Sequence, residues 1–170
     1  METAAKNFFS SSQFAVVGAS SDPAKFGHKT CTPINPSSSA IHVPNFPTSL
    51  NLPSNASRKS EVETGIDVST VPNVSALTSP TQTSLSIITP PKVTSKVLRE
   101  AKEAGIRAVW LQPGSFDQET LDWAKKEIGK DRVVGGGDGE DEEGTVGGEG
   151  WCVLVDGENA MRAASQAGKL

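Results

Sequence analysis

Apolar runs and helical patterns alternate through the second half of the chain. Residues Thr83–Thr89 are rich in β-branched side chains and are followed by two prolines, which is typical of a strand that ends there. From Val93 to Ala104 the apolar residues recur at helical spacing, with Pro91 suited to the first turn and Gly105 to the end of a helix. Ile106–Leu111 is again a short apolar run, which predicts a strand buried on both faces.

A second helix is expected after this strand. Leu121, Ala124 and Ile128 lie on one side of a helical pattern, and Gly129 follows where the helix would end. The residues from Ser115 to Gln118 have the spacing of a capping box, which predicts that Ser115 begins the helix.

The two ends of the chain complete the alternation. The apolar run Gln13–Gly18 predicts a first strand, Trp151–Val155 predicts a last strand, and Asn159–Ala167 predicts a terminal helix. Strands that alternate with helices are typical of an α/β domain built on a parallel sheet.

Two polar stretches interrupt this pattern. Residues 37–82 are dominated by Ser, Thr, Pro and Asn, and so long a loop is unusual in a compact domain unless it contains a short strand or is partly disordered. We take Ile66–Val71 as the candidate strand. Gly135–Gly150 contains eight glycines and six acidic residues, which predicts a flexible loop between a helix and the last strand. The expected organisation is a single domain over residues 8–170 that carries both stretches.

The charge is concentrated in one of these stretches. The chain of 170 residues has a net charge of −4, and the part outside Gly135–Gly150 has 16 basic and 14 acidic residues, a net charge of +2. A nearly neutral remainder argues against nucleic-acid binding, which needs a concentrated basic face. With no long apolar run, no signal-peptide pattern and only two cysteines, we expect a soluble cytoplasmic protein that does not bind membranes.

The most informative chemistry follows the first strand. Gly18 would let the backbone approach a phosphate closely, and the hydroxyl groups of Ser20 and Ser21 could donate hydrogen bonds to it. Lys25 would add a positive charge. An ordinary turn from strand to helix has a similar composition, and the dinucleotide fingerprint G-x-G-x-x-G is absent because Ser20 replaces its second glycine.

Two further strand ends carry specialised turns. Thr89-Pro90-Pro91 ends one strand with two prolines, which remove backbone donors and could form a flat apolar wall for a base. Gln112-Pro113-Gly114 ends the next strand with a side-chain amide and a glycine. Because the carboxyl ends of parallel strands meet at one edge of a sheet, the three turns predict a shared ligand crevice.

Several motifs together resemble one known family. These are the sequence GASSDPAKFG at Gly18–Gly27, Asn35-Pro36, Thr89-Pro90-Pro91, AVWLQPG at Ala108–Gly114, and the late Cys152. In this order they resemble the small CoA-binding domain family, whose members are Rossmann-like domains related to the N-terminal domain of the succinyl-CoA ligase α subunit. The resemblance implies a three-layer α/β fold with a mostly parallel sheet.

The resemblance also implies the ligand-binding residues. The glycine loop would hold the phosphates, the Asn-Pro and Pro-Pro motifs would line the adenine side, and the glutamine turn would complete the site. The residues that correspond to these motifs are Gly18, Ala19, Ser20, Ser21, Lys25, Phe26, Asn35, Pro36, Thr89, Pro90, Pro91, Gln112, Pro113 and Gly114.

The chain departs from the family pattern in its first crossover. In such domains a helix and a second strand lead into the Asn-Pro motif. Here only 13 residues run from Ala19 to Cys31, just before Asn35-Pro36, and a complete crossover needs at least about 10 to 12 in addition to the strands. We therefore expect a shortened first crossover helix.

Little in the sequence indicates catalysis. His28 and His42 lack the partners that a metal site or a phosphate-carrying histidine requires, and Cys152 lies in an apolar run without an activating residue. The expected function is a non-catalytic domain that binds CoA, acyl-CoA or a related adenine nucleotide. One alternative is an interaction or scaffold protein with a degenerate site. A second is an NAD(P)-binding protein, although the Asn35-Pro36 region offers no acidic residue for a ribose.

Overall fold

A seven-stranded β-sheet forms the centre of the structure, a computed structural model that describes residues 2–19, 24, 40–44, 60–61, 67–136 and 151–166. The strands are β1 (Gln13–Ala19), β2 (Ala40–Pro44), β3 (Ser60–Glu61), β4 (Asp67–Thr70), β5 (Thr83–Ile87), β6 (Ala108–Leu111) and β7 (Val133–Val134). They lie in the order β3-β4-β2-β1-β5-β6-β7, and all neighbouring pairs are parallel except β3 and β4. The expected α/β class with a mostly parallel sheet is confirmed.

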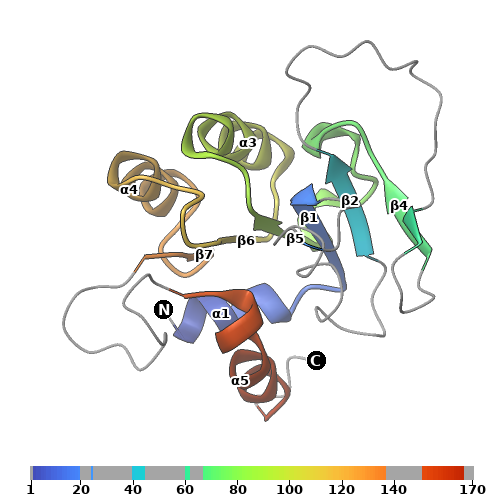
Figure 1. Ribbon diagram of the computed structural model, residues 1–170. Helices are drawn as coiled ribbons and strands as arrows, with labels where there is room; N and C mark the ends of the chain where they lie inside the picture. Colours follow the sequence, from blue (N-terminus) through green and yellow to red (C-terminus); the bar gives the residue numbers. More distant parts are fainter. Residues whose placement is uncertain are drawn as a thin grey trace.

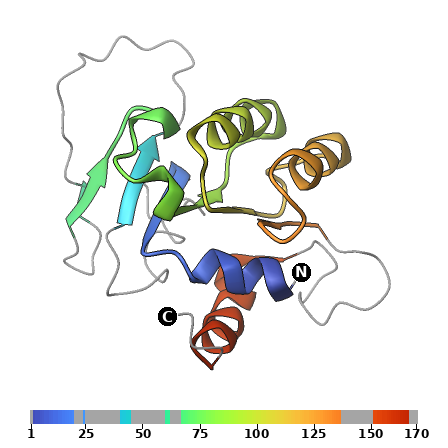
Figure 2. The same cartoon turned by 180° about the vertical axis from the view of Figure 1, so that it is seen from behind.

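Helices cover both faces of the sheet. They are α1 (Glu2–Phe9), α3 (Pro91–Ala104), α4 (Gln118–Glu127) and α5 (Val153–Gln166), with the short 3₁₀ turns η1 (Val74–Ala76) and η2 (Pro80–Gln82). Figure 1 shows α3 and α4 on one face and α1 and α5 on the other, and the reverse view in Figure 2 shows the same three layers. This is a Rossmann-like arrangement. None of the helices in the described ranges combines the length and apolar character needed to cross a bilayer.

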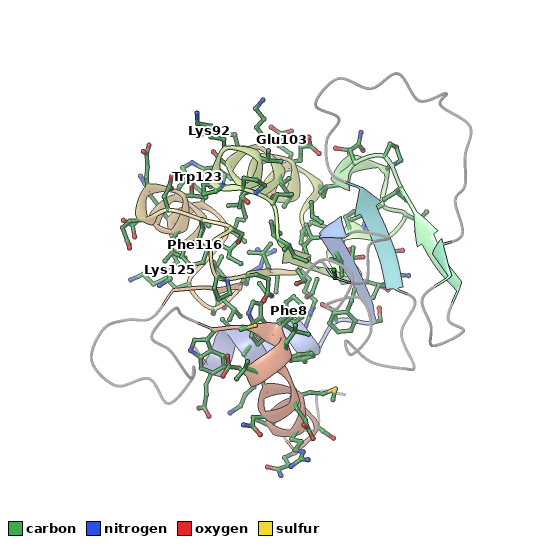
Figure 3. All side chains as sticks on the ribbon, viewed as in Figure 1. Phe8, Lys92, Glu103, Phe116, Trp123 and Lys125 are labelled. Atoms are coloured by element: carbon green, nitrogen blue, oxygen red, sulfur yellow. The ribbon has the colours of Figure 1, made fainter. Side chains whose placement is uncertain are left out.

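Alternation along β1 divides the core into two clusters. Ala15 and Val17 belong to the cluster under α3 and α4, whereas Phe14 and Val16 belong to the cluster under α1 and α5. Successive side chains of a strand point to opposite faces, so one apolar run supplies both layers. Phe8 of α1 completes the second cluster and lies between its helix and the sheet in Figure 3.

Two serines lie in the buried strand β5. The side chains of Ser84 and Ser86 are fully buried, although a buried hydroxyl group is costly without a partner. The Ser84 hydroxyl donates to the carbonyl of Phe8 at 3.0 Å and lies 2.6 Å from the Ser11 hydroxyl. These bonds connect the sheet to the end of α1, so Ser84 contributes to the packing between layers.

The expected helix after β5 is confirmed as α3. Pro91 is its first residue, and the backbone N–H of Gly105 donates to the carbonyls of Ala101 and Lys102 at its end. Val97, Leu98 and Ala101 are buried against the sheet. In Figure 3, Lys92 and Glu103 project from the outer side of this helix, as its amphipathic pattern requires.

The second helix is confirmed as α4, but its cap differs from the expectation. The side chain of Asp117, rather than that of Ser115, accepts a hydrogen bond from the backbone N–H of Thr120 at 2.8 Å. The Ser115 hydroxyl instead donates to the carbonyl of Gln112 at 2.7 Å. The preceding turn uses the serine, so the capping position moves two residues along the chain.

The expected strand at Trp151–Val155 is wrong, because α5 begins at Val153 and continues through the predicted terminal helix. The last strand of the sheet is β7, a pair of valines that is too short for its pattern to indicate a strand. Since β7 occupies the sheet edge beside β6, the C-terminal segment packs against α1 instead. The stretch 135–150 therefore follows a strand and precedes a helix, and its residues 137–150 lie outside the described ranges.

The second strand also lies elsewhere than expected. The family pattern predicts that Asn35-Pro36 follows it, but β2 pairs with β1 and begins at Ala40, after the motif. The interval between β1 and β2 is residues 20–39, rather than the short interval ending near Cys31. Nearly all of this interval lies outside the described residues, so the shortened crossover helix stays a prediction.

The polar stretch 37–82 contributes strands to the sheet. The candidate strand at Ile66–Val71 is confirmed as β4, which pairs with β2. The sequence pattern did not indicate β2 itself or the short β3.

The sequence pattern does not indicate the N-terminal helix α1 either. It has only eight residues, and its buried face consists of Ala4, Ala5, Phe8 and Phe9. An isolated helix of this length is marginal in water, so packing on the sheet and on α5 stabilises it.

Candidate functional site

The strand order reverses between β1 and β5. From β1 the chain continues to β2 on one side, whereas β4 leads back across to β5 on the other side of β1. In open parallel sheets, ligands bind outside the carboxyl ends of the strands at this switch point. At these ends lie Gly18-Ala19, the last two residues of β1, and Ile88-Thr89, which follow β5; both pairs overlap the predicted turns.

Gly18 packs directly against Thr89. Its φ is +93°, and an added Cβ would lie 3.1 Å from the Thr89 Cγ2 atom and 3.3 Å from the Thr89 nitrogen. A larger residue would therefore meet both backbone strain and crowding. The requirement for glycine at this position comes from the neighbouring strand end, a contact that the sequence pattern did not reveal.

The Pro-Pro turn is held by bonds within the protein. Thr89 is buried, and its hydroxyl lies 2.8 Å from the hydroxyl of Thr94. The carbonyl of Pro90 accepts hydrogen bonds from the N–H groups of Val93 and Thr94 at 2.8 and 2.9 Å. Because Pro90 and Pro91 have no N–H group, α3 begins with few free donors.

The glutamine turn is a tight turn that follows β6. The N–H of Ser115 donates to the carbonyl of Gln112 at 2.9 Å, and Gly114 has a φ of +81°. Proline followed by a residue with positive φ is typical of a type II turn. An added Cβ at Gly114 would meet no atom within 4 Å, so the turn itself requires the glycine.

The side chain of Gln112 is fully buried and bonded at both ends. Its Nε2 atom donates to the Ser86 hydroxyl at 3.1 Å, and its Oε1 atom accepts from the N–H of Val153 at 3.1 Å. The amide thus connects β5 and β6 with the first turn of α5. Although Gln112 lies at the expected edge, its side-chain polar atoms bond to the protein.

The first turn of α5 brings further residues near this edge. The backbone N–H of Cys152 donates to Oδ2 of Asp156 at 2.8 Å, and the indole Nε1 of Trp110 donates to the carbonyl of Trp151 at 3.1 Å. Burial raises the pKa of Asp156, an effect partly offset by the hydrogen bond from Cys152. Sequence reasoning missed Asp156. The only feature of the sequence that could have indicated this residue is its position, four residues after Cys152.

The structure therefore juxtaposes some of the predicted site residues. Gly18 contacts Thr89, while Gln112 and its turn occupy the next strand end. The remaining predicted residues lie outside the described ranges and stay predictions; they are Ser20, Ser21, Lys25, Phe26, Asn35 and Pro36. Among the described residues, no three His, Cys, Asp or Glu side chains form a group that could hold a metal ion.

Comparison with known proteins assigns the chain to a family. The model of the CoA binding domain family matches residues 12–137. The chain belongs to the CoA binding domain family. The matched range of this family member includes every strand of the sheet, together with α3 and α4, whereas α1 and α5 lie outside it.

Two solved structures from Pyrococcus species are similar to this chain. A hypothetical protein from Pyrococcus horikoshii OT3 is 13% identical, with coverage of 98% of this chain and 91% of that chain and a TM-score of 0.56. This likeness shows the shared fold. A conserved hypothetical protein from Pyrococcus furiosus is 27% identical over 68% of this chain and 86% of that chain, with a TM-score of 0.49. Comparison with curated proteins found no match.

Proposed function

We propose that this family member binds CoA or acyl-CoA at the carboxyl ends of β1 and β5 without catalysing a reaction. The observation that carries the proposal is the contact of Gly18 with Thr89 at the topological switch point, inside the range that matches the family. A backbone with positive φ at the end of β1 presents main-chain atoms where a side chain would otherwise lie.

The two strand ends differ in chemistry, which suggests how the ligand is oriented. The loop after β1 contains Ser20, Ser21 and Lys25, which suit the phosphates of CoA. The turn after β5 has two prolines and few free donors, so it suits the flat face of an adenine better than an anion. We therefore place the phosphates beside Gly18 and the base beside Pro90 and Pro91, with Phe26, Asn35 and Pro36 as further contacts.

The side chains at this edge support binding without turnover. Thr89, Gln112 and Asp156 bring polar atoms to the described part of the edge, and all three form hydrogen bonds within the protein. None of these three is placed as a nucleophile or a general base, since each is already used to hold a turn or a helix end. The residues play a structural part in the site.

Isothermal titration calorimetry of the full chain tests this proposal. We expect CoA and acetyl-CoA to bind more tightly than NAD or NADP, and Gly18→Ala to weaken CoA binding at least about tenfold through crowding against Thr89. Gly105→Ala is the matched control. Gly105 also has a positive φ but lies at the far end of α3, where an added Cβ would have only an ordinary contact of 3.6 Å with Thr81.

Other results would contradict the proposal. Tighter binding of NAD or NADP would favour the nicotinamide-nucleotide alternative. If the folded protein bound none of the four nucleotides, an interaction or scaffold protein with a degenerate site would be the better interpretation. Equal losses of CoA affinity in Gly18→Ala and Gly105→Ala would indicate that the ligand does not bind at the β1–β5 edge.

A further inference from the structure

Thr94 is a buried polar residue to which the sequence pattern assigned no role. It lies in the first turn of α3, and its exposed fraction is 0%. Its hydroxyl oxygen is 2.8 Å from the carbonyl oxygen of Thr89 and 2.8 Å from the Thr89 hydroxyl oxygen. The side chain therefore makes two contacts with one residue of the predicted ligand site.

The number of available protons determines the direction of these two bonds. A threonine hydroxyl has a single proton to donate. The Thr94 proton goes to the carbonyl of Thr89, because a carbonyl oxygen can only accept. In the bond between the two hydroxyls, Thr89 must then donate and Thr94 must accept. The only proton of the Thr89 hydroxyl is thus directed into α3 and is not available to a ligand.

This bond also fixes the methyl group of Thr89. The Oγ1 and Cγ2 atoms share the same Cβ, so fixing one atom in a staggered rotamer fixes the other. The Cγ2 atom is the nearest neighbour of the position that a Cβ at Gly18 would occupy, 3.1 Å away. A continuous chain of contacts therefore runs from Thr94 in α3 through Thr89 to Gly18 at the end of β1.

We propose that Thr94 is a positioning residue of the CoA site: it holds Thr89 in the rotamer that supports the backbone at Gly18. This inference rests on the proposed binding of CoA at the same edge. Thr94 acts through Thr89 and makes no contact with the ligand. Because its partners are a carbonyl and a hydroxyl, Ser can replace it, whereas Val, which has nearly the same shape, cannot.

Calorimetric titration with CoA tests this role with two substitutions at one position. Thr94→Val removes the hydroxyl at nearly constant volume, and we expect the dissociation constant to rise about three- to tenfold. Thr94→Ser keeps the hydroxyl, and we expect the dissociation constant to stay within about twofold of the wild-type value. The rescue separates hydrogen bonding from packing, because Ser fills the buried site less well than Val.

Ser84→Ala provides a matched control for the loss of a buried hydroxyl. Ser84 is also fully buried and lies on β5, but its partners are Ser11 and Phe8, on the α1 side of the sheet. We expect this variant to lower the unfolding midpoint while leaving the affinity for CoA unchanged. An equal loss of affinity in Ser84→Ala would show that general destabilisation, rather than positioning, weakens binding.

The outcomes distinguish this inference from the proposed function. If the wild-type protein does not bind CoA, the proposed function fails. If the wild-type protein binds CoA and Thr94→Val binds it equally well, the positioning role of Thr94 fails while the proposed function stands. Should Thr94→Val not fold, Thr89→Val removes the same bond from its other end. Unchanged affinity in that folded variant would overturn the inference.

Discussion

The side-chain oxygen of Gln112 accepts a hydrogen bond from the backbone nitrogen of Val153, 3.1 Å away and 41 residues later in the chain. The N–H groups of the first helical turn lack partners within their helix, so an amide from the end of β6 supplies one here. The same amide donates to Ser86. A single side chain thereby ties the C-terminal helix, which lies outside the range matching the family, to the centre of the sheet.

Replacing Gln112 with leucine should therefore destabilise the fold. Gln112→Leu leaves the buried Ser86 hydroxyl and the Val153 N–H without these partners, which we expect to lower the free energy of unfolding by about 1–3 kcal/mol. Urea denaturation followed by circular dichroism measures the change. Gln82→Leu is the control, because Gln82 is exposed and the hydrogen bond that it accepts from Ser12 is also exposed. Equal stability of the two variants would show that the buried amide contributes nothing.

Two glycines with positive φ should respond differently to alanine. At Gly114 the added Cβ meets open space, so Gly114→Ala has only the backbone cost of about 1–2 kcal/mol. At Gly18 the added Cβ also crowds Thr89, and we expect Gly18→Ala to cost about 1 kcal/mol more than Gly114→Ala.

The crowding at Gly18 can be tested with a second substitution. Thr89→Ser removes the Cγ2 atom while keeping the hydroxyl, so the cost of Gly18→Ala should be smaller in the Thr89→Ser background. Urea unfolding of the four proteins in this double-mutant cycle gives the coupling free energy. A coupling of zero would mean that the contact between Gly18 and Thr89 does not restrict this position.

Asp156 should make stability depend on pH. Burial raises the pKa of its carboxyl group above the ordinary value, despite the hydrogen bond from Cys152. Between the two pKa values the folded protein holds more protons at this group than the unfolded chain does. The free energy of unfolding therefore falls as pH rises through this interval, and the loss persists above it.

Substitution with asparagine isolates this effect. Asp156→Asn cannot ionise, yet its side-chain oxygen can still accept the hydrogen bond from Cys152. Urea denaturation from acidic to neutral pH should show the variant gaining stability relative to the wild type as pH rises. Asp131→Asn, at an exposed position, controls for the general loss of a negative charge. A pH-independent difference between the wild type and Asp156→Asn would contradict the assignment.

Local pattern was sufficient for the elements whose type and limits are marked by residues close together in the sequence. Helix α3 was predictable because Val97 and Ala101 lie on one helical face and Gly105 ends it. The first strand was predictable because Gln13–Gly18 is a compact apolar run between polar residues. In each case the residues that determine the structure lie within a few turns or one strand of one another.

Long-range contacts determined what the sequence did not show. The Ser86 hydroxyl and the Gln112 amide are buried with partners, since the amide donates to Ser86 and accepts from the N–H of Val153. No local pattern in the sequence records these bonds. The same limit applies to the site. The turn containing Gly18 could be located, but the dependence of this glycine on Thr89 follows from strand order, since β1 and β5 are adjacent only in the folded sheet.

The segment after Trp151 gives the sharpest test of helix against strand. In a strand, Val153 and Val155 would share one face, because side chains alternate with a period of two. In α5 they do not: Val153 is 5% exposed and Val155 is 54% exposed. Val153→Ala should therefore lower the free energy of unfolding by about 1–3 kcal/mol through lost burial. Val155→Ala should leave it unchanged or raise it by up to about 0.5 kcal/mol, because alanine favours helix. Equal destabilisation by both substitutions in urea denaturation would instead support a strand at this segment.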